Sequence, residues 1–436
     1  MLIKSIFTNS SGILFSRILG FIRDLLTASI LGANIYSDIF FVAFKLPNLF
    51  RRIFAEGAFT QAFIPAYAKA KHKIRFSSII FLQLIGFLLI LSLFVTLFSE
   101  LITKAIALGF DEKTVKLAAP LVAINFYYLP LIFIVTFMAA LLQYKNHFAT
   151  TAFSTALLNL ALIAALLISK DLDKYQITYY LSYGVLIGGF LQVIAHIIAI
   201  KKKNLLKIFT FDRKKKEENR FYKSFLGATI GSSTAHISAF LDTWLASFLV
   251  SGSISYLYYA NRVFQLPLAL FAIATSIALF PMISKAIKNK DEQKALRLLK
   301  KSTSILFILL SIATIIGIIF NEFIIWLLFQ RGAFTQIDTQ NTALILIMYL
   351  IGLLPFGIAK IFSLWLYSHE KQFLAAKISM KALAWNIVFS LALIIPYEAA
   401  GLALASTLSG FILFYLTIKE FGLSKFLNLF TNKSLL

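Results

Sequence analysis

The sequence predicts an all-α integral membrane protein of about twelve transmembrane helices, arranged as two six-helix lobes related by a parallel pseudo-twofold repeat. Of the 436 residues, 59% are hydrophobic, and the mean hydropathy is +0.84. Soluble domains are only about 45–50% apolar. Apolar runs of about twenty residues recur along nearly the whole chain, which is the length an α-helix needs to cross a bilayer. Related segments begin at Tyr36 and Tyr256, on either side of the longest hydrophilic stretch.

Short polar or basic segments separate the apolar runs and set the approximate ends of each expected helix. The run after Lys4 is interrupted by Arg17, Arg23 and Asp24 and has no small-residue cleavage site, so it predicts a retained first span rather than a signal peptide. The expected helices cover residues 7–31, 36–67, 78–108, 115–143, 148–169, 176–200, 222–250, 255–285, 303–329, 341–368, 374–395 and 399–419.

The basic residues fall mainly on one side of these spans. Most of the 42 Lys and Arg residues lie in the "KAKHKIR" loop, the 201–223 stretch, the 285–301 stretch and the tail. The positive-inside rule therefore predicts that this side is cytoplasmic, with both termini inside. Because topology explains the net charge of +23, we expect no nucleic-acid partner.

Composition also argues against an enzyme. The chain has no cysteine, and its five histidines are scattered without a metal-binding spacing such as HExxH. A polyprenyl-phosphate glycosyltransferase would carry acidic or histidine-bearing motifs in its extramembrane loops, whereas these loops are short and rich in lysine. A transporter is the favoured class.

An internal repeat defines the expected domains. "YSDIFFVAFKLPNLF" and "YLYYANRVFQLPLAL" align so that Gly32 meets Gly252 and Pro47 meets Pro267. Six spans per half, an even number, give both halves the same orientation, which is typical of transporters with a site between two repeats. The expected domains are an N-terminal lobe over 1–205, a cytoplasmic basic linker over 206–221 and a C-terminal lobe over 222–436.

Charges within the first two expected helices are the main functional signal, because a charge in the bilayer is costly. These two helices contain five cations (Arg17, Arg23, Lys45, Arg51 and Arg52) but only three acids (Asp24, Asp38 and Glu56). Arg52 and Glu56 are four residues apart and are expected to form a structural ion pair. Arg17 and Asp24 share a helix face, while Arg23 lies well round from both.

At least two of these cations remain unmatched. Arginine forks bind phosphate oxygens through parallel N–H donors. Arg17, Arg23, Arg51 and Arg262 are therefore candidates for a cationic cavity that receives a polyanion. Internal ion pairs, or arginines that snorkel to the interface, are the structural alternative.

The stretch "SRILGFIRDLLTASILGANIYSDIFFVAFKLPNLFRRIFAEGAFTQAFIPAYAK" resembles the N-terminal signature of the MurJ (MviN) lipid II flippases of the MOP exporter superfamily. The likeness continues in "TALLNL", "SGSISYLYYANRVFQLPLAL", "LFPMIS" and "FQRGAFT". It implies a MOP/MATE-like bundle that flips undecaprenyl-pyrophosphate-linked disaccharide-peptide across the bacterial cytoplasmic (inner) membrane by alternating access. The substrate-binding residues it implies are Arg17, Arg23, Asp24, Asp38, Asn48, Arg51, Asn159 and Arg262, with Glu56 also at a matching position.

Two departures from the family pattern affect the expectations. Family members usually have fourteen spans, and the last two form a groove proposed for the lipid tail, which this chain is expected to lack. Some members bind sodium in the C-terminal lobe. The matching positions are Asp242, Asn386, Ser390 and Ser406, so the expected cofactor is none or Na⁺.

Two other functions within the superfamily stay open. A drug/cation antiporter would need an acidic cavity, and a flippase for another polyprenyl-linked glycan would share the arginines but not the "KLPNLFRRIFAEGAF" signature. The expected partners are lipid II, membrane lipids and the cell-wall synthesis machinery, with the transporter itself a monomer.

Overall fold

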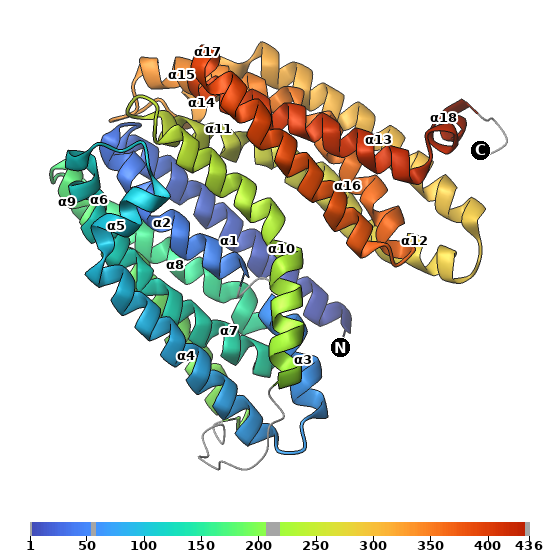
Figure 1. Ribbon diagram of the computed structural model, residues 1–436, viewed down its shortest axis with the longest axis horizontal. Coiled ribbons are helices and arrows are strands. Elements are labelled where there is room, and N and C mark those ends of the chain that lie inside the picture. Colours follow the sequence, from blue (N-terminus) through green and yellow to red (C-terminus); the bar gives the residue numbers. More distant parts are fainter. Residues whose placement is uncertain (1, 54–57, 206–218, 432–436) are drawn as a thin grey trace. The chain divides into compact units, whose positions relative to one another are not determined.

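The computed structural model describes residues 2–53, 58–205 and 219–431 (Figure 1). These residues form helices joined by short loops, with no strand among them, which confirms the all-α class. The chain divides into two compact units. The N-terminal unit comprises Met1–Gly252 and Arg331–Phe334, and the C-terminal unit comprises Ser253–Gln330 and Thr335–Leu436.

Both units are helical bundles. The helices of the N-terminal unit are α1 (Leu2–Leu31), α2 (Ile35–Ile53), α3 (Phe59–Lys69), α4 (Lys73–Leu97), α5 (Ser99–Ile106), α6 (Glu112–Phe126), α7 (Tyr128–Tyr144), α8 (Ala149–Ser169), α9 (Lys174–Lys202) and α10 (Asn219–Ala246). The helices of the C-terminal unit are α11 (Ser253–Pro267), the π-helix η2 (Leu268–Ile273), α12 (Ala274–Lys288), α13 (Glu292–Ile319), α14 (Asn321–Phe329), α15 (Gln336–Ile351), α16 (Leu353–Ser368), α17 (Gln372–Phe421) and α18 (Leu423–Thr431).

Within the described residues, each expected span falls largely on one helix or on consecutive helices. Eight helices or helix runs of the described chain are long and apolar enough to cross a membrane, so the count of twelve stays a prediction. One of the eight is α17, which is interrupted at Glu398 (φ 47°, ψ −128°). This non-helical residue separates the two helices expected over 374–395 and 399–419.

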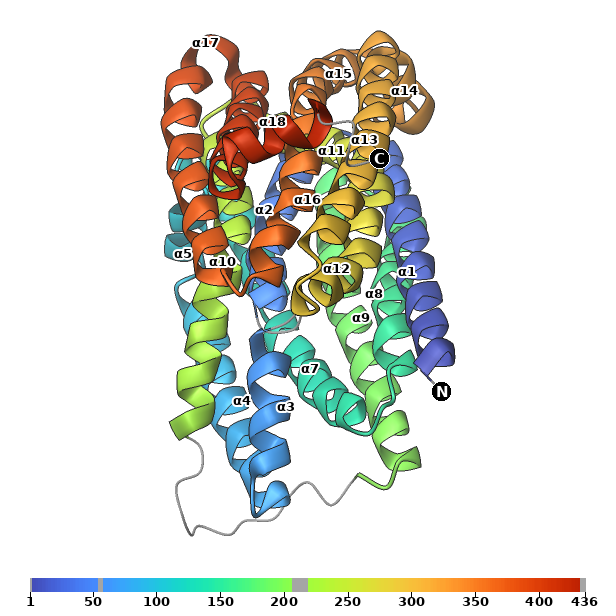
Figure 2. The ribbon, with the colours of Figure 1, turned by 90° about the vertical axis from the view of Figure 1, so that its right-hand side faces the viewer.

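In the N-terminal unit, α8 packs between α1 and α9, as both views show (Figures 1 and 2). A cluster of phenylalanines joins α3, α7 and α10. Phe59 is fully buried, and its ring centroid lies 5.6 Å from that of Phe133, 5.8 Å from that of Phe221 and 6.1 Å from that of Phe225. Such edge-to-face contacts add to the packing that holds helices together in a membrane.

The position of α10 bears on the expected domain boundary. Most of the linker expected over 206–221 lies outside the described residues. The helix that follows it, α10, belongs to the N-terminal unit, and the compact units divide after Gly252. The boundaries of the two functional lobes stay a prediction.

Two glycines that align in the internal repeat begin equivalent helices. Gly32 (φ +79°) precedes α2, and Gly252 (φ +95°) precedes α11, both in the left-handed region that L side chains rarely adopt. Each helix also contains a proline near its C-terminal end, Pro47 in α2 and Pro267 in α11. The two halves therefore share their local turn geometry as well as their sequence pattern.

Candidate functional site

Arg23 on α1 is held by protein acceptors. Its Nε and Nη2 donate to Oδ1 of Asp24 at 3.1 and 2.6 Å, and its Nη1 donates to Oδ1 of Asn159 at 3.1 Å. The two charged side chains are only 12% and 4% exposed. Arg23 therefore pairs with Asp24, although the helix geometry places Arg23 well round from it. Adjacent side chains leave a helix about 100° apart, but the long arginine stem lets the guanidinium reach its neighbour's carboxylate.

Asn159 fixes this pair between two helices. It lies on α8, and its Nδ2 donates to the backbone oxygen of Ser16 on α1 at 2.9 Å. A Cβ built on Gly20 would come within 3.3 Å of the same nitrogen, so the glycine leaves room for the amide. Asn159 thus bridges α1 and α8 and positions Arg23.

Arg17 has a different environment from Arg23. It is exposed near the middle of α1, and it makes no hydrogen bond or ion pair within the part of the chain that the structure describes. The acid expected to share its helix face, Asp24, is buried and is bound to Arg23 instead. The guanidinium of Arg17 is therefore accessible to an anion.

Further along the first half, α2 carries Asn48 and Arg51. Nε of Arg51 donates to Oδ1 of Asn48 at 3.3 Å, and both side chains are half-buried. Pro47 comes immediately before this pair. Glu56 lies outside the described residues, so the ion pair expected between Arg52 and Glu56 stays a prediction.

The carboxylate of Asp38 accepts a hydrogen bond from the backbone of a loop. It is 2% exposed, and its Oδ2 accepts the backbone N–H of Gly252 at 2.6 Å. Beside it, the backbone N–H of Ala333 donates to the oxygen of Ser29 at 2.6 Å. These bonds fix two loops, the one before α11 and the one before α15, at the C-terminal end of α1.

Sequence reasoning missed the second of these loops. A signal for it is the repeated "GAFTQ" at 57–61 and 332–336, although this repeat does not follow the spacing of the two halves. The structure shows that the second copy makes a close backbone approach. A Cβ on Gly332 would lie 2.2 Å from the oxygen of Ser29, and a Cβ on Gly32 would lie 2.5 Å from the oxygen of Ala333.

Arg262, in the C-terminal unit, is oriented by Tyr258 one turn earlier on α11. Its Nη2 donates to the tyrosine hydroxyl at 2.8 Å, and its guanidinium carbon lies 4.8 Å from the centroid of the ring. This combination of a hydrogen bond and a cation–π contact holds the fork in one direction. The i, i+4 spacing of Tyr258 and Arg262 could have indicated the pairing.

The residues expected to hold sodium are divided between the two units. Asp242 lies on α10 in the N-terminal unit, whereas the other three lie on the two segments of α17. Nδ2 of Asn386 contacts Oγ of Ser406 at 3.4 Å, and Oγ of Ser390 is buried without a hydrogen-bond partner in the described chain. No group of three or more His, Cys, Asp or Glu side chains among the described residues could hold a metal ion.

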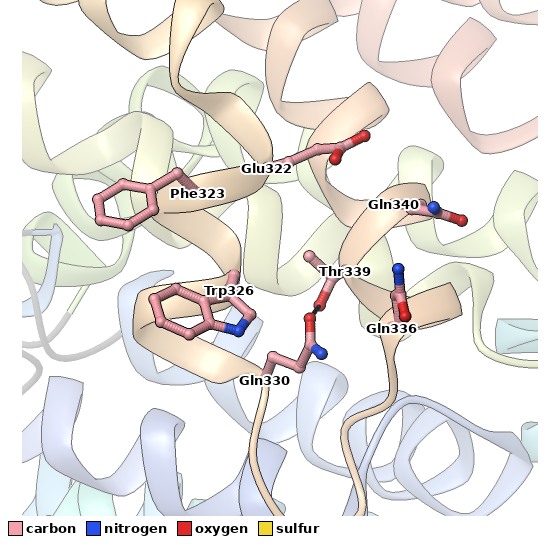
Figure 3. Close-up of a pocket in the computed structure, with 7 residues that line it drawn as sticks. All are labelled: Glu322, Phe323, Trp326, Gln330, Gln336, Thr339 and Gln340. Carbon is pink, nitrogen blue, oxygen red and sulfur yellow. Dashed lines mark hydrogen bonds between the residues drawn. The ribbon is translucent and has the colours of Figure 1, made fainter.

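An open pocket of about 400 Å³ lies between α14 and α15 (Figure 3). Oγ1 of Thr339 donates to Oε1 of Gln330 across it at 2.8 Å. None of the residues expected at the substrate site lines this pocket, whose walls are Glu322, Phe323, Trp326, Gln330, Gln336, Thr339 and Gln340.

Comparison with known proteins identifies the family to which the chain belongs. The model of the family described as "Lipid II flippase MurJ" matches residues 27–434. The chain belongs to the lipid II flippase MurJ family. The probable lipid II flippase MurJ of Helicobacter pylori (strain J99) is 50% identical over 422 residues, covering 93% of this chain and 92% of the relative. The corresponding protein of Aquifex aeolicus is 38% identical over 347 residues, covering 78% and 67%.

Solved structures agree with this assignment. A lipid II flippase MurJ in an inward closed conformation has a TM-score of 0.84 and 26% identity, covering 97% of this chain and 89% of that one. An inward-facing multidrug resistance MATE transporter of the MOP superfamily has a TM-score of 0.76 at 12% identity, which shows a shared fold. The chain is therefore a multi-pass membrane transporter of the MurJ family and not an enzyme.

Proposed function

We propose that this protein flips lipid II, the undecaprenyl-pyrophosphate-linked disaccharide-peptide precursor of peptidoglycan, from the cytoplasmic to the outer leaflet by alternating access. Membership of the MurJ family supports the substrate. The observation that carries the proposal is Arg17, an exposed cation near the middle of a 30-residue helix with no protein partner in the described chain. A cation at such a place faces water or a polar ligand rather than hydrocarbon.

Each arginine has a different role in the proposed binding of a pyrophosphate. Arg17 offers all its N–H donors to the ligand. Arg23 is fixed by Asp24 and Asn159 and contributes charge from a rigid position. On the other unit, Arg262 presents a fork directed by Tyr258. Phosphate oxygens accept two parallel N–H donors from such a fork, so the anionic head of lipid II fits this chemistry better than an organic cation does.

The expected topology places the protein in the bacterial inner membrane with both termini in the cytoplasm, as the one-sided distribution of lysine and arginine supports. In this orientation the basic loops face the anionic cytoplasmic leaflet. We propose that the protein works as a monomer supplied by the cell-wall synthesis machinery. Cross-linking in cells, followed by measurement of the mass of the cross-linked products, tests both the monomeric state and the contact with the synthesis machinery.

Depletion complementation tests the function. Bacteria depleted of their own lipid II flippase should survive when they express this chain, and the Arg17→Ala variant should not rescue them. Arg17→Lys keeps the charge but loses the fork and should rescue partially. Lys71→Ala, at an exposed loop position, is the matched control and should rescue fully. Full rescue by Arg17→Ala, at equal protein level, would contradict the proposed role of the cation.

Sodium is a second proposal, for the C-terminal unit. Neutral amide and hydroxyl oxygens from Asn386, Ser390 and Ser406 suit a hard, weakly held cation. The buried hydroxyl of Ser390, which has no hydrogen-bond partner in the described chain, supports a cation site at this place. Bound sodium would supply positive charge that ties the two segments of α17 together. Sodium should then raise the melting temperature of the purified protein, and potassium should not. The Ser390→Ala variant should show a smaller rise.

A further inference from the structure

The helix that carries Arg262 has a polar stripe that none of the expected site residues explains. Tyr258, Asn261, Arg262 and Gln265 follow the spacing i, i+3, i+4 and i+7, which places them within about 100° on one face of α11. All four side chains are partly or fully exposed, whereas the opposite face is buried through Tyr259, Ala260 and Phe264. A polar stripe on an otherwise apolar spanning helix faces water or a polar ligand.

Two of these residues form an amide pair. Nε2 of Gln265 donates to Oδ1 of Asn261. This bond leaves Oε1 of Gln265 as an acceptor and Nδ2 of Asn261 as a donor, and neither has a hydrogen-bond partner in the described chain. The pair therefore presents one carbonyl and one amino group side by side, which is the complement of the N–H and C=O of a secondary amide.

The distance from Arg262 suits one part of the proposed substrate. An α-helix rises 1.5 Å per residue, so Gln265 lies about 4.5 Å along the axis from Arg262. In lipid II, the sugar joined to the pyrophosphate carries an acetamido group on the carbon next to the linkage. When the phosphate occupies the fork of Arg262, this acetamido group lies within about one helical turn of it.

We propose that Asn261 and Gln265 form a subsite that recognises the acetamido group of the pyrophosphate-linked sugar. This inference rests on the proposed function, because it takes the position of the pyrophosphate from Arg262. The subsite gives the transporter a means to distinguish a lipid that carries the N-acetylated sugar from the bare undecaprenyl pyrophosphate carrier. The carrier would meet the same arginine but would leave the amide pair unoccupied.

A binding experiment with three lipids tests the subsite. The purified full-length protein in detergent is titrated with undecaprenyl pyrophosphate, with lipid II and with lipid II whose pyrophosphate-linked sugar has been de-N-acetylated. Wild-type protein should bind lipid II about threefold to tenfold more tightly than the de-N-acetylated lipid, as expected for one or two hydrogen bonds. The double variant Asn261→Leu with Gln265→Leu should lose this preference while its affinity for undecaprenyl pyrophosphate changes less than about twofold.

Controls separate the subsite from folding and from the proposed function. Leu266→Ala, an exposed position on the same helix, should keep the preference, and a melting curve establishes that the double variant is folded. A preference that survives in the double variant overturns the subsite. Equal wild-type affinity for lipid II and its de-N-acetylated form also overturns it, with the flippase proposal intact. Failure of wild-type protein to bind any of the three lipids contradicts the flippase proposal itself.

Discussion

Arg23 directs three nitrogens at Asp24 and Asn159, and Arg17, six residues earlier on the same helix, has no acceptor in the described chain. In the proposed function, Arg23 contributes charge from a position fixed by Asp24 and Asn159, and Arg17 makes direct contacts with the substrate. The exposed arginine keeps its charge and its donors for the substrate.

A substitution at Asn159 should separate these roles. Asn159→Asp keeps an oxygen for Arg23 but adds a second negative charge beside it, and it loses the N–H that donates to Ser16, so transport should fall further than in Asn159→Ala. Asn159→Ala loses the same bond to Ser16 without adding charge and should lower the free energy of unfolding by about 1–3 kcal/mol. Complementation and thermal melting measure the two effects. Normal transport by Asn159→Asp would show that the charge around Arg23 does not matter.

The sequence predicted the residue types of the candidate site but not how they pair. Helix geometry places Arg17 on the same helix face as Asp24 and places Arg23 away from Asp24. It considers only the direction in which each Cβ points. In the structure Arg23 binds Asp24, because the arginine stem is long enough to reach it, and Asn159 on α8 supplies a second acceptor. The i, i+4 spacing of Tyr258 and Arg262 permits their pairing, but only the rotamers show that the hydroxyl accepts from the guanidinium.

At the level of elements, backbone approach at Gly32 and Gly332 fixes the C-terminal end of α1. Gly32→Ala would place a methyl group 2.5 Å from the oxygen of Ala333 and would require a left-handed conformation that costs an alanine about 1–2 kcal/mol. We expect a clear fall in melting temperature and in complementation. Gly86 on α4 is the matched control, because nothing lies within 4 Å of the position its Cβ would take. Gly86→Ala should be neutral or stabilising by up to about 1 kcal/mol.

The phenylalanine cluster explains why α10 belongs to the N-terminal unit. Phe59→Ala should empty the centre of the contact between α3, α7 and α10 and destabilise the protein by about 3–5 kcal/mol. Phe87→Ala, at a position that is 56% exposed on α4, should change the melting temperature little. An equal effect of the two substitutions would contradict the importance of the cluster. Sequence periodicity could not predict this contact, because a phenylalanine that packs on another helix and one that faces lipid look alike.

At the scale of the whole molecule, the fold class followed from composition, since apolar runs of spanning length permit few structures other than helices. The units were harder to predict. The basic linker marks a change in composition, whereas compactness depends on which helices touch, and α10 lies after the linker yet packs on α3 and α2.

We propose that the net positive charge of the first half couples transport to the membrane potential, either instead of sodium or together with it. A membrane potential, negative inside, favours the state in which the cations lie nearer the cytoplasm. One charge moved through 100 mV is worth about 2.3 kcal/mol, which is roughly a fiftyfold shift between two states. Collapsing the potential with the sodium gradient intact should therefore trap the cavity open to the outside. Because the chain has no cysteine, a single cysteine at Asn48 in a variant that still complements reports this by labelling. Labelling that follows sodium and ignores the potential would contradict electrical coupling.

The π-helical segment between Pro267 and Ala274 has a consequence for the evolution of this helix run. Widening one turn of a helix accommodates one extra residue without rotating the elements on either side. Loss of a single residue such as Ala269 would convert the segment to α-helix and leave both the polar stripe of α11 and the packing of α12 facing as before. A deletion within α8 would instead turn every following side chain by about 100°. Deletion of one residue should therefore be tolerated at Leu268–Ile273 and rejected in regular spans, so η2 is a place where the helix run can shorten by one residue while the polar stripe of α11 keeps its direction.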